Sequence, residues 1–371
     1  MKQKRKLQQV LIQRITKTFW LFCAFNLLPC NANADESIVL RELKVVTTSK
    51  LKFDNFVIQT VKGEKVYWDQ VVSGKLSGTR QQQFDQLLET VGRPLFRMRH
   101  RLDLGDFESL KTIPETFFSN LNDSPTNQSN ARHKFIVAMS CYFGRLASGQ
   151  RAQSTLPLFQ ACKLLRKFPQ LRNVLDESVL EPIDARNGFA ENLVPIWFDK
   201  AAVKQTLFQI PNSNVSKLTD GQLIYECSMA VTMLESPDDH LQALAQRKSD
   251  IAQTSFLIIK TLQNSKPETA QLLSKYRDLS GSMRAAANFA LGNRQSIRND
   301  EIDDAVLDLL YIPANYSRQL PELSAAALYR AQEILKKENR FDEAQIVQSK
   351  LLADYKNTYH GRLGLKPTKV K

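Results

Sequence analysis

The sequence has few histidines and glycines, and each shortage removes a class of site. Only four histidines occur, and no two of them lie within five residues of each other or of a cysteine: His100, His133, His240 and His360. A local metal site needs shorter ligand spacings than these. The 13 glycines form no phosphate-cradling loop, and neither H-E-x-x-H nor G-x-S-x-G occurs. We therefore predict no catalytic residue, no metal site and no cofactor, and leave open a catalytic pair that only the fold brings together.

Long apolar runs are missing from the amino terminus as well. The run over residues 18–29 is interrupted by Asn26 and Pro29, and it falls short of the ~20 apolar residues that span a bilayer core. Basic side chains without any acid precede it, and small residues follow it at Ala32 and Ala34. This order is typical of a secretory signal peptide.

We predict a signal peptide over residues 1–34 that is cleaved after Ala34. The protein is then exported to the periplasm or the cell exterior and has no membrane span after cleavage. Two alternatives are an uncleaved membrane anchor and a lipoprotein at Cys30. The lipoprotein is disfavoured because Pro29 stands where such a cysteine is normally preceded by a small residue.

An excess of positive charge is present but belongs largely to this signal. Cleavage removes six of the 51 basic side chains and no acid, so 45 remain against 38 acidic ones and the formal charge falls from +13 to +7. A residual charge of this size favours solubility and says little about the fold. We therefore expect no nucleic-acid partner, because binding of a nucleic acid would require a continuous stripe of basic side chains on the protein surface.

Three cysteines remain after the predicted cleavage: Cys141, Cys162 and Cys227. Export permits a disulfide. If residues 135–147 and 152–167 form an antiparallel helical hairpin, Cys141 and Cys162 lie at similar distances from its turn. Two interpretations remain, a disulfide between Cys141 and Cys162 or buried free thiols.

Residues 35–78 are predicted to form a small β-rich element. Three runs rich in Val, Ile, Phe, Tyr and Trp indicate strands at 38–46, 55–61 and 66–72, and Lys62-Gly63-Glu64-Lys65 reads as a hairpin turn. Tyr67 and Trp68 would then point to opposite faces of one strand. We interpret Trp68 as a core side chain that fills the packing face of the sheet, in preference to a surface on which a ligand stacks.

The rest of the chain is predicted to be helical, so the fold class is mainly α. The body at 79–360 is rich in Leu, Ala, Gln, Glu and Lys. Phe84, Leu87, Leu88 and Val91 mark one helix face, and residues 92–94 should stop that helix. Within an irregular Pro-containing stretch at 168–222, residues 195–199 form a rigid aromatic segment whose Asp199 caps a helix at 200–208. Residues 361–371 form a basic flexible tail.

The clearest local motif lies near the end of the chain. Residues 325–332 lead to a turn at 339–344, and a second helix closes at 351–358. A helix, a tight turn that ends in Phe341, and Asp-Glu-Ala at the start of a partner helix resemble a tetratricopeptide unit.

Small residues at Ala331 and Ala344 suit the close helix approach that such a unit requires. The sequence departs from the family pattern at Gln348, where an aromatic is usual, and at Lys356, where proline is frequent. The turn recurs at 105–110 and more faintly at 149–151 and 291–293. The irregular spacing predicts an irregular α-α helical stack.

The order of parts also resembles exported proteins of planctomycete bacteria to which no activity is assigned. The shared features are the signal, a strand region with Tyr67-Trp68-Asp69, an arginine-rich helix before Gly105-Asp106-Phe107, the segment at 197–199 and the tetratricopeptide-like end. The resemblance covers most of the chain and implies a fold, not a reaction.

The densest basic cluster after the signal is an arginine-rich helix. Arg93, Arg97 and Arg101 are spaced to share one helical face, so they form a candidate contact for an anion or an acidic partner. The competing interpretation is a solvated face balanced by acids of neighbouring helices.

The predicted helical stack, which would expose a long groove, and the lack of catalytic signatures favour a non-enzymatic binding or scaffold module that uses a helical-repeat surface, with another envelope or secreted protein as partner. The alternative is an enzyme, or an enzyme accessory subunit, that acts on an envelope polymer. A groove lined by Asn, Lys and aromatic residues would favour binding. A pocket that gathers carboxylates, or Arg97 and Arg101, or Trp68 or Trp197, would favour the enzyme.

Overall fold

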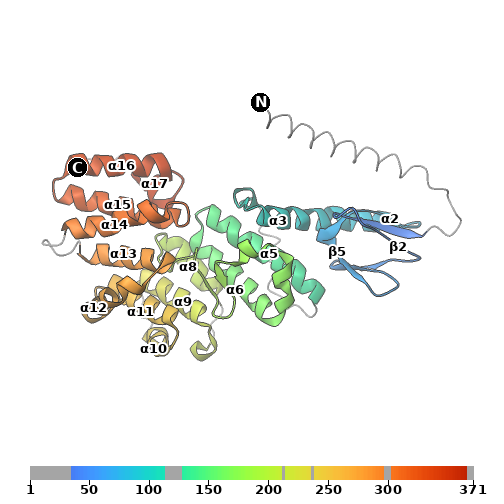
Figure 1. Ribbon diagram of the computed structural model, residues 1–371, viewed down its shortest axis with the longest axis horizontal. Helices are drawn as coiled ribbons and strands as arrows, with labels where there is room; N and C mark the ends of the chain where they lie inside the picture. Colours follow the sequence, from blue (N-terminus) through green and yellow to red (C-terminus); the bar gives the residue numbers. More distant parts are fainter. Residues whose placement is uncertain (1–34, 113–127, 211–213, 235–237, 296–301, 366–371) are drawn as a thin grey trace. The chain divides into compact units, whose positions relative to one another are not determined.

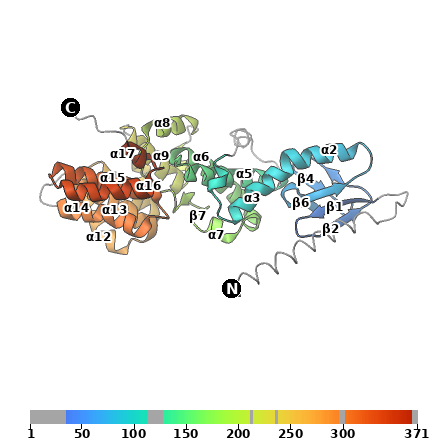
Figure 2. The same ribbon diagram turned by 90° about the horizontal axis from the view of Figure 1, so that it is seen from above.

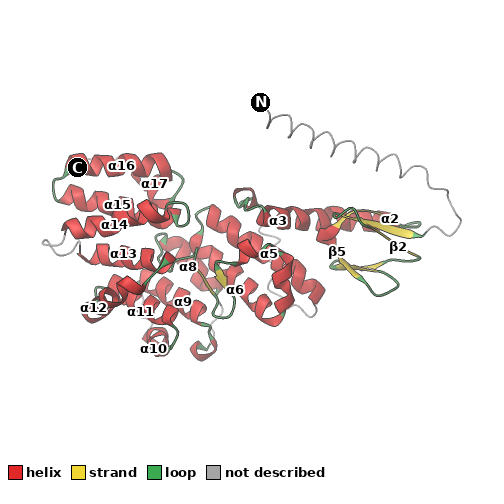
Figure 3. Cartoon of the chain, in the orientation of Figure 1, coloured by secondary structure: helices red, strands yellow, loops and turns green. Residues whose placement is uncertain are grey.

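The computed structural model describes residues 35–112, 128–210, 214–234, 238–295 and 302–365. The predicted signal peptide, with Ala32 and Ala34, lies outside the described residues, as do residues 366–371 of the predicted tail. The prediction that this flexible tail begins at residue 361 is wrong, because residues 361–364 belong to the helix α17 (Tyr359–Gly364) and Gly361 is buried. The chain divides into two compact units, Met1–Pro94 and Leu95–Lys371. Its described part is mainly α with a β-rich beginning (Figure 3), so the predicted fold class is confirmed.

The first unit holds two three-stranded antiparallel sheets, with strand orders β2-β1-β6 and β3-β4-β5. The strands are β1 (Glu36–Leu40), β2 (Val45–Thr48), β3 (Lys52–Phe53), β4 (Val57–Gln59), β5 (Lys65–Tyr67) and β6 (Val71–Lys75). Six short strands thus replace the three longer ones predicted. Residues 38–46 contain a turn at Leu43, whose φ is 62°. The predicted turn at 62–65 joins β4 to β5, with Gly63 at a φ of 84°.

Trp68 lies in the core of this unit, in the short 3-10 helix η1 (Trp68–Gln70) and not in a strand as predicted. It is fully buried and packs 5.2 Å from the Phe84 ring of α2 (Arg80–Leu87), which contacts β6 (Figure 2). Phe53 meets both rings edge-on. The indole Nε1 donates to the Asp54 carbonyl at 2.7 Å. All of these contacts are structural, in agreement with the core interpretation.

The predicted helix stop at residues 92–94 is wrong. α2 runs into a π-helical turn, η2 (Leu88–Gly92), which leads into α3 (Arg93–Asp103). The Arg93 N–H bonds the Leu88 carbonyl, five residues back. Because Pro94 has no N–H to donate, the wider π turn tolerates it without ending the helix.

Helices dominate the second unit. The longer ones are α5 (Gln128–Ala147), α6 (Arg151–Lys167), α8 (Lys200–Gln209), α9 (Asp220–Thr232), α10 (Asp238–Gln246), α11 (Asp250–Leu262), α12 (Lys266–Lys275), α13 (Gly281–Gln295), α14 (Ile302–Tyr316), α15 (Pro321–Lys337) and α16 (Phe341–Tyr355). Shorter elements are η3 (Glu108–Leu110), η4 (Pro169–Val174), α7 (Glu177–Leu180), β7 (Ile183–Asp184), β8 (Phe189–Ala190), η5 (Val215–Lys217), η6 (Tyr276–Asp278) and α17 (Tyr359–Gly364). Successive helices α13 to α16 pack on one another as layers (Figure 1).

The hairpin turns were well predicted where glycine or asparagine adopts a left-handed conformation. Asn339 has a φ of 58° between α15 and α16, and Gly149 has a φ of 74° between α5 and α6. Ala331 and Ala344 are buried, as a close approach of α15 and α16 requires. The turn expected at 291–293 is wrong, because Gly292 lies inside α13 and a Cβ there would come within 2.8 Å of Leu309 on α14.

The cysteines of the described chain, Cys141, Cys162 and Cys227, are all buried. Cys141 lies on α5 and Cys162 on α6, the two helices of the predicted hairpin, and neither forms a disulfide. Burial raises the pKa of Cys162 to about 12, which keeps the thiol protonated. As for membranes, none of the described helices is long and apolar enough to cross one.

Candidate binding site

The aromatic segment at residues 195–199 is held in place by α9. Trp197 is buried, and its Nε1 donates to Ser228 Oγ at 2.7 Å. The Tyr225 hydroxyl, one turn earlier, accepts from the Ala190 N–H at 3.1 Å and so holds β8, which precedes the segment. Asp199 accepts from the Ala202 N–H at 3.1 Å and caps α8 as predicted. The segment at residues 195–199 is therefore held by hydrogen bonds to α9 at Trp197 and to α8 at Asp199.

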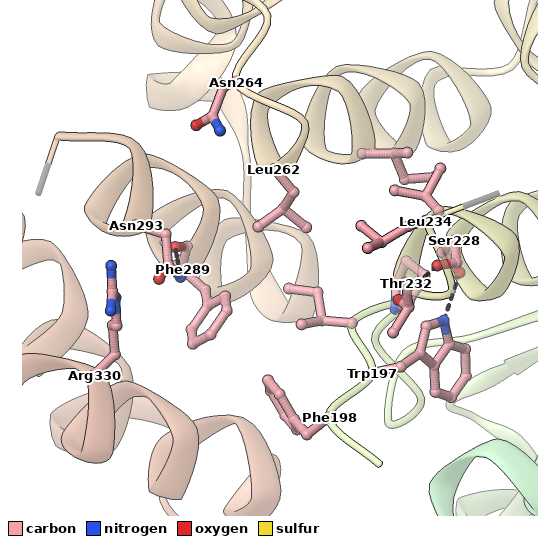
Figure 4. A pocket seen from close by; sticks show the side chains of 14 residues that line it. Trp197, Phe198, Ser228, Thr232, Leu234, Leu262, Asn264, Phe289, Asn293 and Arg330 are labelled. Carbon is pink, nitrogen blue, oxygen red and sulfur yellow. Dashed lines mark hydrogen bonds between the residues drawn. The ribbon is translucent and has the colours of Figure 1, made fainter. Parts of the chain in front are cut away.

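One side of this segment borders a cavity of about 420 Å³ (Figure 4). Its other walls come from α9, α11, α13 and α15, together with the residues that directly follow α9 and α11. Phe198, Leu262 and Phe289 point into the space. The cavity volume and its mostly apolar lining are typical of a ligand site.

Polar groups surround the apolar lining. Asn293 lies one turn after Phe289 on α13 and donates through Nδ2 to the Phe289 carbonyl at 2.8 Å. Arg330 enters from α15, with Glu333 Oε2 3.4 Å from its Nη1. Thr232 donates to the Ser228 carbonyl at 2.8 Å. Amide, hydroxyl and guanidinium groups in these positions suit hydrogen bonding to a polar backbone.

Two residues at the edge of the cavity have a left-handed backbone. Leu234 follows α9 with a φ of 62°, and Asn264 follows α11 with a φ of 65°. Asparagine tolerates this conformation, but leucine does so at a cost. Leu234 is also 84% exposed. A strained and exposed leucine beside an apolar cavity is a feature that folding alone does not favour.

The polar side-chain groups that line this first cavity are hydroxyl, amide, guanidinium and indole groups. Within the described chain its residues include no carboxylate, histidine or cysteine. Ser228 lies against the Trp197 indole and donates to the Tyr225 carbonyl at 3.0 Å, so its hydroxyl serves the fold. The lining includes Trp197, which would favour an enzyme, and it includes Asn264, Asn293 and phenylalanine rings but no lysine, so it meets the criterion for binding only in part. The arrangement offers apolar contacts and hydrogen-bonding groups to a ligand.

A second cavity of about 200 Å³ lies on the other side of the same segment and shares Ile196, Trp197 and Phe198 with the first. Its lining is charged, with Arg151, Glu322 and Arg362 among its residues. His360 of α17 packs 4.7 Å from the Phe198 ring and 5.1 Å from Tyr329. Burial lowers the pKa of His360 to about 4, so the ring is neutral at neutral pH.

A third cavity, of about 490 Å³, is lined by two glutamates, Glu181 and Glu191. Both residues are exposed. General acid catalysis by a carboxyl group normally needs a less hydrated setting that favours the protonated form. Glu181 and Glu191 therefore line one cavity, but neither has the burial that would suit it to general acid catalysis.

The arginines singled out from the sequence do not line these three cavities. Arg93 is exposed and pairs with Glu89 at 2.7 Å, a contact within the first unit. In the second unit, Arg101 donates to the Ser109 carbonyl at 2.6 Å, and Arg97 is exposed. Their role in binding an anion stays a prediction. His100 stacks on Phe96 at 5.3 Å, and the described residues hold no cluster of three metal-ligating side chains.

Sequence reasoning identified the aromatic segment but not the cavity beside it. The segment stood out because tryptophan, phenylalanine and proline are adjacent. Leu234, Phe289 and Arg330 carry no such signal, since each belongs to an ordinary helical pattern and reaches the cavity only through packing.

Comparisons with known proteins supply no function for this site. No protein-family model matches the chain, no curated protein matches it, and no solved structure matches it.

Proposed function

We propose that this chain is an exported, non-enzymatic binding or scaffold protein that holds an apolar segment of another envelope or secreted protein in its first cavity. The observation that carries the proposal is the composition of the lining. Trp197, Phe198 and Phe289 supply apolar surface, and Asn293 and Arg330 supply hydrogen-bonding groups at its side.

A protein segment suits this lining better than a purely apolar ligand does. Apolar side chains would fill the aromatic interior, and peptide groups would meet the amide and guanidinium groups of Asn293 and Arg330. Exposed Leu234 would be covered by the partner, which offsets its unfavourable exposure. The layered helices α13 to α16 and the tetratricopeptide-like hairpin at their end support a helical-repeat scaffold, an architecture that offers such surfaces.

The test is affinity capture of the purified protein's partners from its native envelope, followed by mass spectrometry. Leu234→Asn is the site variant, and Leu307→Gln, an exposed leucine on α14 outside the described cavities, is the matched control. We expect a partner that the parent and Leu307→Gln retain and that Leu234→Asn loses. Equal capture by both variants would exclude the first cavity as the binding site.

The alternative function, an enzyme or accessory subunit acting on an envelope polymer, draws its support from the third cavity. Glu181 and Glu191 are the carboxylates that it gathers. Turnover of a wall or glycan substrate that is lost in both Glu181→Gln and Glu191→Gln, with no partner captured, would favour this alternative. Retained turnover in these variants would place any activity elsewhere.

A further inference from the structure

The second cavity contains two guanidinium groups that no described carboxylate pairs with. Arg151 is 9% exposed, and its Nη2 donates to the Val194 carbonyl at 2.9 Å. Its Nε has no hydrogen-bond partner among the described residues. Arg362, on α17, donates to the Asn357 carbonyl at 2.6 Å. The Glu322 carboxyl group attracts both arginines, but no ion pair joins it to either of them among the described residues. Because a buried guanidinium group with an unused N–H is unfavourable, the Nε of Arg151 favours a further anionic group.

The start of α6 adds hydrogen-bond donors to the same cavity. Arg151, Ala152 and Gln153 are the first three residues of this helix, and all three line the cavity. The preceding Gln150 makes no side-chain cap. The first N–H groups of a helix lack intrahelical acceptors and lie at the positive end of its dipole. The cavity therefore offers side-chain charge and backbone donors together.

Two acids also line the cavity: the exposed Asp199, whose carboxylate caps α8, and Glu322. Glu322 is the acid that limits how much negative charge the cavity accepts. It is 6% exposed, lies in the first turn of α15, and accepts from the Tyr359 N–H at 3.0 Å. Burial raises its pKa, and this rise is opposed by the Tyr359 N–H and by the positive charges of Arg151 and Arg362. An anionic ligand is repelled by this carboxyl group whenever it is ionised. A singly charged ligand is consequently favoured over a doubly charged phosphate.

We propose that the second cavity is a carboxylate-binding site, with Arg151 and Arg362 as counter-charges and the first turn of α6 as additional donors. A carboxylate carries a single charge, fits a volume of about 200 Å³ and matches the planar fork of a guanidinium group. The carboxylate comes either from the end of a peptide chain or from a small free acid. The proposal stands independently of the first cavity, because Arg362 and Glu322 do not line it.

Isothermal titration calorimetry with the purified protein tests the site. The probes are acetate, N-acetylphenylalanine and N-acetylphenylalanine amide, which has no carboxylate. We expect the acid to bind at least about tenfold more tightly than the amide, as a charge-assisted contact implies. Tighter binding of N-acetylphenylalanine than of acetate identifies a peptide end, and equal binding identifies a small acid. Equal binding of acid and amide, or no binding of either, would overturn the proposal.

Substitutions show whether the residues of the second cavity bind the carboxylate. Arg362→Gln should weaken binding of the acid about tenfold and leave the amide unchanged, whereas Arg277→Gln, an exposed arginine outside the cavity, should change neither. Glu322→Gln should strengthen binding of the acid, because it removes a like charge. Arg362→Gln and Glu322→Gln together test the site even if replacement of buried Arg151 prevents folding. Weaker binding in Glu322→Gln, or equal behaviour of Arg362→Gln and Arg277→Gln, would contradict the assignment.

Discussion

The Trp197 indole donates its only N–H to the hydroxyl of Ser228 at 2.7 Å, and this bond joins the aromatic segment to α9. Both side chains are buried. The bond fixes the position of the segment whose two sides border the first and second cavities. A single buried contact between residues far apart in the chain thus helps to shape both candidate sites.

Ser228→Ala should lower the free energy of unfolding by about 1–3 kcal/mol, because the buried indole N–H loses its acceptor. Urea unfolding followed by circular dichroism measures the change. In a Trp197→Phe background no donor is present, so the same substitution should cost less. An equal cost in both backgrounds would show that the hydrogen bond contributes nothing.

Leu234→Asn should raise the free energy of unfolding by roughly 1 kcal/mol, since asparagine tolerates the left-handed backbone that strains leucine. The same substitution should abolish partner capture. A gain in stability with a loss of binding distinguishes a binding residue from a packing residue. Thermal unfolding of the variant provides the first measurement, and a lowered Tm would refute the strain argument.

Glu226→Gln should change how stability depends on pH. Glu226 on α9 is buried, which raises its pKa to about 7. His240 Nε2 lies 3.4 Å from its Oε2, but this long contact with a partly exposed histidine does not offset the burial. A raised pKa contributes stability that is present below pH 4.5 and is lost as the pH rises through 7.

The loss amounts to about 3 kcal/mol at most. Glu226→Gln should therefore be more stable than the parent at pH 8 and similar to it at pH 4.5, as measured by urea unfolding across this range. Glu177→Gln, an exposed glutamate on α7, serves as the control and should follow the parent. A variant whose stability parallels the parent at every pH would contradict the burial argument.

His360→Phe should remove a source of acid sensitivity. The neutral ring of His360 packs among Phe198, Tyr329 and Tyr359, and its pKa is lowered to about 4. A lowered pKa contributes stability that is present above pH 6.5 and is lost as the pH falls through 4. Phenylalanine keeps the ring contacts without the titration, so the variant should lose less stability between pH 6.5 and 4. His100→Gln, on an exposed helix face, should behave like the parent.

Local sequence signals predicted much of the secondary structure. The hairpin of α5 and α6 around Gly149, the turn at Asn339 and the Asp199 cap of α8 all follow from interactions between residues a few positions apart. The helix break at 92–94 was predicted from an equally local pattern and is wrong, and the single strand predicted at 66–72 is divided between β5 and β6 by η1. Both places lie in the core around Trp68, which is fully buried in η1: a Cβ on Gly92 would meet the Trp68 carbonyl at 3.2 Å.

The sequence by itself determined the mainly helical class, the β-rich beginning and the turns, because periodicity and turn chemistry act over short distances. Only the tertiary structure decided that Trp197 borders a cavity with Leu234, Phe289 and Arg330, and that the Nε of buried Arg151 has no hydrogen-bond partner among the described residues. These features depend on which helix faces meet, and burial and charge pairing are properties of that packing. Residues that look ordinary in the sequence became the candidate site when helices distant in the chain packed around one aromatic segment.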